Sequence, residues 1–258
     1  MTQIDVNTFV GTYPYRDIGA WTAEALVRVC IDAGTTSAWV SHLSAAYWSD
    51  PAGGNAALFG LAAAHGILRP VAAVHPGRPG WEAVLAEARA RRAPAIRCDA
   101  SWYGLEPAGS EMRSLLEASA DHDIPVMMCV RLEDLRQRHP NDVTPDLQPA
   151  TIRQLIRHAP RARLIVTHAD REFIEQVHFG STPEEASRIL WDISCIWGPP
   201  EDHLELLLGT VGIERFIYGT GIPLRLAETT AAKIDLLGLD AHARRRLLSE
   251  NLTGFGVE

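Results

Sequence analysis

The segment from Leu164 to Asp170 ends in two side chains that can do chemistry, His168 and Asp170. The four residues before the histidine favour a buried strand, and residues 151–158 carry apolar side chains at helical spacing before a stop at Pro160. An imidazole at the end of a buried strand can transfer a proton or bind a metal. We interpret His168 as a candidate acid or base. The alternatives are a core histidine bonded to the backbone and an Asp170 that caps the next turn.

A cysteine stands near the end of the preceding predicted strand, residues 124–131. Neighbouring strands of a sheet lie about 4.8 Å apart, so Cys129 and His168 can meet. Such a contact predicts a thiolate–imidazole pair that acts as nucleophile and base. A buried thiol that only fills space is the alternative interpretation.

Two arginines at strand ends, Arg97 and Arg131, suggest binding of an anion. If both guanidinium groups face the same cavity, they form a clamp suited to a carboxylate. Because alternate residues of a strand share a face, Arg97 can instead pair with Asp99. A register error of one residue would reverse both arginines, so the sequence leaves their direction open.

Further polar and aromatic residues follow other predicted strands. Asn7, His42, Tyr103 and Asp192 are predicted to bind substrate together with Arg97, Asp99 and Arg131, and structural hydrogen bonds or solvated loop positions are the alternatives. Large aromatic side chains crowd the loops after several strands, where polar residues are usual. They either wall a ligand pocket or pack against another subunit.

These residues need a scaffold that brings many strand ends together, and the sequence provides one. Strand patterns and helical patterns alternate along the chain. The strands are expected at residues 4–7, 36–41, 68–74, 95–99, 124–131, 164–170, 190–194 and 216–223. Helices are expected at residues 21–33, 55–65, 80–92, 110–122, 151–158, 201–211, 226–237 and 240–249, with a further helix start at residue 182.

Eight such units in 258 residues predict an α/β protein, a TIM (β/α)8 barrel in a single domain over residues 1–258. A doubly wound open sheet is the rival architecture. The sequence contains no G-x-G-x-x-G after the first strand and no P-loop motif, which argues against dinucleotide or P-loop nucleotide binding. In a barrel, the carboxyl ends of the strands would form one mouth and carry the site.

The charge and amino-acid composition of the chain exclude some classes of binding partner. The net charge of -8 and the pI near 5.7 argue against nucleic acid or an anionic membrane surface, and favour a small-molecule substrate. The sequence has no long apolar span, and its first residues lack the features of a signal peptide, so we expect a cytoplasmic protein. Four widely spaced cysteines without a C-x-x-C motif fit reduced thiols.

The order of segments resembles the amidohydrolase superfamily in its amidohydrolase-related branch. The resemblance covers nearly the whole chain and is carried best by residues 124–128 (IPVMM), 164–168 (LIVTH), 214–223 (ERFIYGTGIP) and 247–252 (LLSENL). It implies a barrel whose first strand ends in H-x-H, whose fifth and sixth strands end in histidine, and whose eighth strand carries G-[ST]-D-x-P. Those groups bind one or two divalent metals that activate a hydrolytic water.

This sequence departs from that pattern at most ligand positions. Asn7 and Phe9 stand at the H-x-H positions, Cys129 at the fifth-strand histidine and Gly221 at the eighth-strand aspartate, so only His168 is kept. A catalytic zinc site needs three protein ligands. We therefore predict a barrel without the family's full metal centre, and the sequence assigns no definite cofactor. A divalent metal such as zinc, held by His168, Asp99 and His42, is the alternative.

The resulting functional expectation is a hydrolase, or a related lyase or lactonase, that acts on a small carboxylate-bearing compound. His168 would be the acid or base, Arg97 or Arg131 would hold the anion, and Asn7 and Cys129 would complete the pocket. A non-catalytic ligand-binding barrel is the alternative from another class. The resemblance also implies a homodimer.

Overall fold

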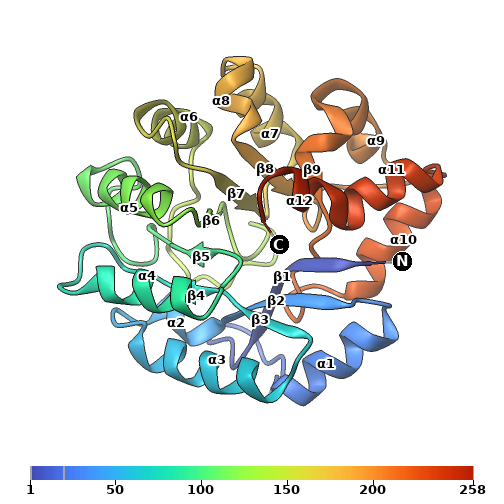
Figure 1. Ribbon diagram of the computed structural model, residues 1–258. Coiled ribbons are helices and arrows are strands. Elements are labelled where there is room, and N and C mark those ends of the chain that lie inside the picture. Colours follow the sequence, from blue (N-terminus) through green and yellow to red (C-terminus); the bar gives the residue numbers. More distant parts are fainter. Residues whose placement is uncertain (1, 20, 258) are drawn as a thin grey trace.

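A closed ring of parallel strands surrounded by helices forms the centre of the computed structural model, which describes residues 2–19 and 21–257 (Figure 1). The strands are β1 (Ile4–Val10), β2 (Ser37–His42), β3 (Leu68–Pro70), β4 (Ala72–Ala73), β5 (Ile96–Arg97), β6 (Val126–Cys129), β7 (Leu164–Thr167), β8 (Ile189–Asp192) and β9 (Phe216–Ile217). β3 and β4 are two parts of one barrel strand, because only Val71 separates them and its N–H donates to Val40 O at 2.8 Å. The ring therefore has eight strands.

Parallel pairing runs from β1 to β3 and from β4 to β9 in chain order. Two contacts between the first and last strands close the ring. Phe9 N–H donates to Ile222 O at 2.9 Å, and Val6 N–H donates to Tyr218 O at 3.0 Å. The predicted barrel is thus confirmed, and the open sheet is excluded because an open sheet leaves its edge strands unpaired.

Helices follow the strands and cover the ring from outside (Figure 1). Their bounds are α1 (Ala23–Asp32), α2 (Leu43–Tyr47), α3 (Ala52–Ala64), α4 (Trp81–Ala90), α5 (Ser110–Asp121), α6 (Pro149–His158), α7 (Arg171–His178), α8 (Pro183–Ser187), α9 (His203–Leu207), α10 (Ala227–Leu236), α11 (Ala241–Arg245) and α12 (Asn251–Gly254). Short π-helical or 3₁₀ turns occupy residues 208–212, 213–215 and 246–250. None of the described helices is long and apolar enough to cross a membrane.

α2 and α7 lie outside the residue ranges in which the sequence pattern predicts helices. α7 begins after Asp170, whose Oδ1 accepts the N–H of Phe173 at 2.9 Å. The interpretation of Asp170 as a helix cap is therefore confirmed. The predicted helix at residues 201–211 begins later, at His203, after the two prolines at 199 and 200.

Alternation along the strands divides the core into two layers. On β6, Val126 and Met128 pack outward against the helices, whereas Met127 packs inside the ring. β1 departs from this rule, because its register against β2 shifts between Asp5 and Thr8. The irregularity lets Val6 join the inner layer while Asn7, the next residue, also faces inward toward other strand ends.

Candidate functional site

The mouth of the barrel holds a buried hydrogen-bond network that joins four strands. Arg97 Nη2 donates to Asn7 Oδ1 at 2.9 Å, and Asn7 Nδ2 donates to Asp192 Oδ2 at 2.8 Å. The other oxygen of Asp192 accepts the backbone N–H of His168 at 2.9 Å. The structure thus brings together four of the site residues predicted from the sequence.

Arg97 lies in the interior and is 2% exposed. Its Nε donates to Ser41 Oγ at 3.1 Å, and its guanidinium carbon lies 4.7 Å from the centroid of the Phe9 ring. Its Nη1 has no hydrogen-bond partner. Arg97 forms no ion pair with Asp99, so the predicted pairing of these two side chains is wrong. Both carboxylate oxygens of Asp99 are also without a partner, and burial raises the pKa of that carboxyl against the opposing effect of Arg97.

His168 has one engaged and one free ring nitrogen. Its Nδ1 lies 2.8 Å from Arg131 O, and because a carbonyl only accepts, Nδ1 carries the hydrogen and donates it. Nε2 is then an acceptor, and it has no partner. Burial, followed by the charges of Arg225 and Arg97, lowers the pKa of His168 well below its ordinary value. The site therefore holds a neutral imidazole with a free lone pair.

Cys129 lies beside His168 as predicted, with Sγ 3.5 Å from Nδ1. The predicted thiolate–imidazole pair does not form, because Nδ1 donates its hydrogen to Arg131 O and is not free to accept the thiol proton. Burial also raises the pKa of Cys129 well above its ordinary value. The thiol packs with Phe9 and Leu132 in an apolar cluster, as in the alternative interpretation of a space-filling cysteine.

Arg131 does not share a clamp with Arg97. Its Nε lies 2.8 Å from Asp146 Oδ2, and its Nη1 donates to Asp170 Oδ2 at 2.9 Å. Two carboxylates therefore neutralise this guanidinium, whereas Arg97 is held by neutral groups. The two-arginine anion clamp predicted from the sequence is wrong, because these partners point the two side chains to different places.

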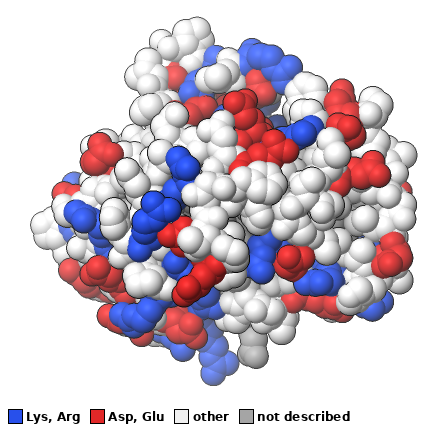
Figure 2. All heavy atoms as spheres, turned by 90° about the horizontal axis from the view of Figure 1, so that it is seen from above, with Lys and Arg blue, Asp and Glu red and all other residues white. Residues whose placement is uncertain are grey.

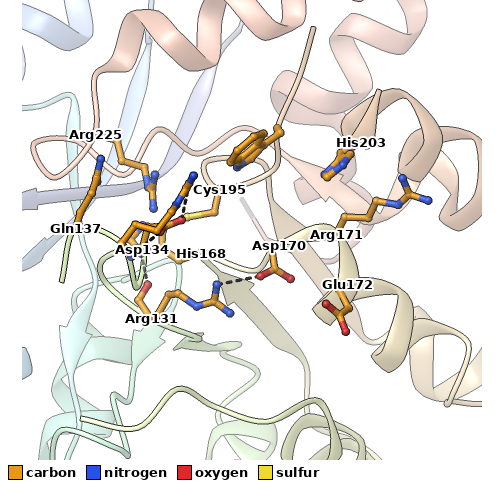
Figure 3. A pocket seen from close by; sticks show the side chains of 12 residues that line it. Arg131, Asp134, Gln137, His168, Asp170, Arg171, Glu172, Cys195, His203 and Arg225 are labelled. Atoms are coloured by element: carbon orange, nitrogen blue, oxygen red, sulfur yellow. Dashed lines mark hydrogen bonds and ion pairs between the residues drawn. The ribbon is translucent and has the colours of Figure 1, made fainter. Parts of the chain in front are cut away.

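A pocket with a volume of about 410 Å³ opens beside His168 (Figure 3). His168, Cys195 and Arg225 line one side of it, and Arg171, Glu172 and His203 line the other. The remaining lining residues are Arg131, Asp134, Arg136, Gln137, Asp170 and Trp197.

Arg225 is the lining arginine that has no ion-pair partner within residues 2–19 and 21–257. Arg136 binds Asp134, with Nε to Oδ1 at 2.9 Å, and Arg171 binds Glu175 at 2.8 Å. Arg225 forms no such contact, and its buried Nε lacks a hydrogen-bond partner. A methyl group placed on Gly221 would lie 3.0 Å from His168 Nε2 and 3.2 Å from Arg225 Cδ. The free imidazole nitrogen and the aliphatic stem of Arg225 therefore both lie beside Gly221.

Arg225, Cys195 and Trp197 line the pocket but are not among the site residues predicted from the sequence. The signal for Arg225 was its place two residues after Pro223, in the loop that follows the eighth strand of a barrel. Trp197 stacks on His203 with ring centroids 6.2 Å apart and is 45% exposed at the pocket.

His42 and Tyr103 lie outside this pocket, contrary to the prediction. Ser41 points inward to Arg97, so His42 points to the other side of β2, where it packs against Gly11. Tyr103 donates its hydroxyl to Ala45 O at 2.7 Å and stacks on His75 at 4.4 Å. Both residues support the loops around the mouth.

Four loop aromatics fill the side of the mouth away from the pocket. Tyr13, Tyr15, Tyr47 and Trp102 contact one another with ring centroids 5.7 to 6.4 Å apart. They pack over Phe9 and Cys129. Tyr13 is buried by this cluster, and the other three rings are half-buried.

The residues of the mouth do not fit a divalent metal. Among the described residues, no group of three or more His, Cys, Asp or Glu side chains is placed to hold one. The alternative set of His168, Asp99 and His42 fails because His42 faces away from the mouth. Phe9 and Arg97 occupy positions at the mouth instead, and neither offers a ligand atom to a cation.

The charged groups outside the site are mixed in sign. Figure 2 shows acidic and basic side chains interspersed over the face in view. Many of them pair locally, for example Arg157 with Glu185 at 2.9 Å and Arg161 with Asp121 at 2.8 Å. Such exposed pairs add little to stability. Arg97 and Arg225, which form no ion pair with the described residues, therefore say more about the function of the site than the exposed pairs do.

The chain matches no protein-family model and no curated protein. Solved structures match it in fold along almost its whole length. A 2,6-dihydroxybenzoate decarboxylase from Rhizobium has a TM-score of 0.76 and 10% identity, with 98% of each chain covered. A dihydroxybenzoic acid decarboxylase from Polaromonas sp., with bound manganese and the inhibitor 2-nitroresorcinol, has a TM-score of 0.75 and 12% identity, with 98% of this chain and 96% of the other covered.

A probable 2-pyrone-4,6-dicarboxylic acid hydrolase from Acinetobacter baumannii, with citric acid bound, is also similar. It has a TM-score of 0.70 and 13% identity, with 99% of this chain and all of the other covered. At these identities the likeness is one of fold. It confirms the barrel that the resemblance to amidohydrolase-related proteins implied.

Proposed function

We propose that this chain is a distant amidohydrolase-related enzyme that hydrolyses an ester or lactone bond in a small carboxylate-bearing compound without a metal. The observation that carries the proposal is that the free Nε2 of a neutral His168 and the side chain of Arg225, which forms no ion pair with the described residues, line the same pocket of about 410 Å³. A neutral imidazole is a base, and a guanidinium is suited to a carboxylate.

Each group has a defined part in the proposed reaction. Arg225 holds the substrate carboxylate at the pocket wall. Nε2 of His168 takes a proton from a water molecule, whose oxygen forms a bond to the carbonyl carbon. The carbon–oxygen bond of the ester then breaks, and the imidazolium returns the proton to the leaving alkoxide. The hydrogen bond from Nδ1 to Arg131 O at 2.8 Å fixes the tautomer that this step needs.

The solved structures of the same fold support this choice of substrate class. Two are named as decarboxylases of dihydroxybenzoates, and one as a probable hydrolase of a pyrone dicarboxylic acid. All three names describe small carboxylates. Decarboxylation is a lyase reaction that the same pocket would also accommodate, and the products of an assay distinguish it from hydrolysis.

The test is a screen of small lactones and esters that carry a free carboxylate, each compared with its methyl ester. We expect turnover of a carboxylate compound and little turnover of its methyl ester. His168→Ala should lower kcat by about 10²- to 10⁴-fold, the usual contribution of a general acid–base group. Arg225→Gln should mainly raise KM. His178→Gln, a half-buried histidine of α7 outside the pocket, is the matched control and should leave the rate unchanged.

A second candidate is a ligand-binding barrel without catalysis. The observation that favours it is the neutral, deeply buried state of His168 and Cys129, which leaves no ionised nucleophile in the mouth. It predicts carboxylate binding that depends on Arg225 with no product formed. If wild type and His168→Ala bind the same carboxylates and both are inert throughout the screen, the binding barrel is the better description.

We further propose a cytoplasmic protein that assembles as a homodimer and binds neither nucleic acid nor membrane. The described cysteines are free thiols, which supports a reducing compartment. The net charge of -8 opposes binding to nucleic acid or anionic lipid, which are themselves negatively charged. Light scattering of the purified protein tests the assembly, and a mass of about 28 kDa would contradict it.

A further inference from the structure

Both inward-facing residues at the end of β1 contact the same guanidinium. Asn7 Oδ1 accepts a hydrogen bond from Arg97 Nη2 at 2.9 Å, and the Phe9 ring lies 4.7 Å from the guanidinium carbon. The Phe9 ring also lies near the His168 ring, with centroids 6.4 Å apart. Arg97 is therefore fixed at the centre of the mouth, between β1 and β5.

The fixed guanidinium forms no ion pair with the described residues, although the carboxyl of Asp99 is near enough for its pKa to be lowered by Arg97. Arg97 is 2% exposed, and its hydrogen bonds go to the neutral side chains of Ser41 and Asn7. No carboxylate among the described residues lies within ion-pair distance of it. A buried charge without a counter-charge is costly, and so is a buried N–H without an acceptor. The Nη1 group of Arg97 is such an N–H, since it has no hydrogen-bond partner.

We propose that Arg97 is a built-in cation at the centre of the mouth, where it takes the place of a metal ion. In this chain the guanidinium excludes a metal ion, and its free Nη1 binds one oxygen of a small oxyanion such as a carboxylate. Asn7 and Phe9 are both suited to hold Arg97, because an amide oxygen and an aromatic face each bind a guanidinium. The inference rests on contacts of Arg97 alone and does not require the reaction proposed for His168.

The first test asks whether Arg97 keeps a metal out. The double variant Asn7→His/Phe9→His introduces two imidazoles beside His168, and a triple variant adds Arg97→Met. After equilibration with Zn²⁺ or Mn²⁺ and desalting, wild type and the double variant should hold less than about a tenth of an ion per chain. The triple variant should approach about one ion per chain, because three imidazoles then surround the vacated space.

Two outcomes would overturn the proposal. In one, wild type itself holds about one ion per chain. In the other, the double variant binds metal as tightly as the triple variant, which would mean that the guanidinium does not occupy the space. Far-ultraviolet circular dichroism and a cooperative thermal transition establish that each variant is folded.

A second measurement keeps the proposal falsifiable if the triple variant does not fold. Formate, compared with chloride at equal ionic strength, should raise the Tm of wild type and of Arg225→Gln but not of Arg97→Gln. Arg188→Gln is the matched control, because Arg188 is also partly buried and also binds neutral groups, the carbonyls of Ile156 and Ala159 at 2.7 and 2.9 Å. A formate response that survives Arg97→Gln contradicts the anion site. A response lost only in Arg225→Gln also contradicts it, while leaving the proposed function intact.

Discussion

Asn7 and Asp192, 185 residues apart in the chain, are joined by a hydrogen bond of 2.8 Å from Nδ2 to Oδ2 at the barrel mouth. Asp192 also accepts the backbone N–H of His168 at 2.9 Å. His168 needs this support because its φ of 58° lies in the left-handed region that residues other than glycine rarely adopt. The carboxylate of Asp192 thus holds the imidazole in place through its backbone.

Asp192→Ala should destabilise the fold and disorder His168. The substitution leaves the His168 N–H and the Asn7 amide without an acceptor in a buried site, and we expect a loss of about 2–4 kcal/mol in the free energy of unfolding, measured in urea. Asp240→Ala removes an exposed helix cap that accepts the N–H of Ala243 at 2.7 Å, and should cost less than Asp192→Ala. Equal losses in both variants would contradict the role of Asp192.

The pKa of His168 should rise when Arg225 loses its charge. Burial lowers this pKa first, and the nearby charges of Arg225, Arg97 and Arg131 lower it further. Nuclear magnetic resonance titration of the His168 Cε1 proton should therefore give a midpoint well below 6.5 in wild type and a higher one in Arg225→Met. Arg136→Met is the control, since Asp134 already neutralises Arg136. An unchanged midpoint in Arg225→Met would exclude a close approach of the two groups.

The lowered pKa of His168 also predicts how activity depends on pH. Catalysis by the neutral imidazole should persist as the pH falls below 6.5, and the acid limb of kcat/KM should shift to higher pH in Arg225→Met. The free energy of unfolding should also depend on the protonation of His168. Because the unfolded chain binds a proton at His168 before the folded chain does, the contribution of this group to stability falls as the pH falls below 6.5.

Asp5 should make wild type less stable as the pH rises toward neutrality. Its carboxylate accepts the Thr220 hydroxyl at 2.7 Å and the backbone N–H groups of Thr220 and Asn7 at 3.1 Å, which joins β1 to the end of β9. Burial nevertheless raises its pKa to about 7. The folded state therefore holds a proton that the unfolded state has released above pH 3.8, and the stability gained from Asp5 is lost as the pH rises through about 7.

Asp5→Asn reproduces the protonated carboxyl and removes this titration. In urea unfolding series at several pH values, the variant should match wild type near pH 4 and exceed it near pH 8 by roughly 2–4 kcal/mol. Asp5→Ala should be destabilised at every pH, because three buried donors lose their acceptor. A wild-type stability that runs parallel to that of Asp5→Asn across the range would disprove the raised pKa.

Gly221→Ala should impair the site beyond its effect on stability. Gly221 has φ of 76°, and a Cβ there would lie 3.0 Å from His168 Nε2. Gly238 has φ of 62° with nothing within 4 Å of its Cβ position, so Gly238→Ala measures backbone strain alone. Each variant should lose about 1–2 kcal/mol of stability. Only Gly221→Ala should also change the His168 titration or turnover, and the same change in Gly238→Ala would remove the steric explanation.

The sequence by itself determined the barrel and the ring of strand ends. Repeated strand and helix patterns require parallel strands covered by helices, and the chain can satisfy that requirement by closing β1 on β9. The sequence also placed Cys129 beside His168 and identified Asp170 as a possible helix cap, because strand spacing and cap chemistry are local rules.

Only the tertiary structure decided what the mouth can do. The sequence pattern does not show the irregularity in β1 that turns Asn7 inward, nor the two aspartates that neutralise Arg131. It also does not show that Arg225, from a loop after the last strand, lies beside His168. Side-chain direction, burial and charge pairing depend on groups distant in the chain, and a protonation state follows from all three, so no local pattern fixes them.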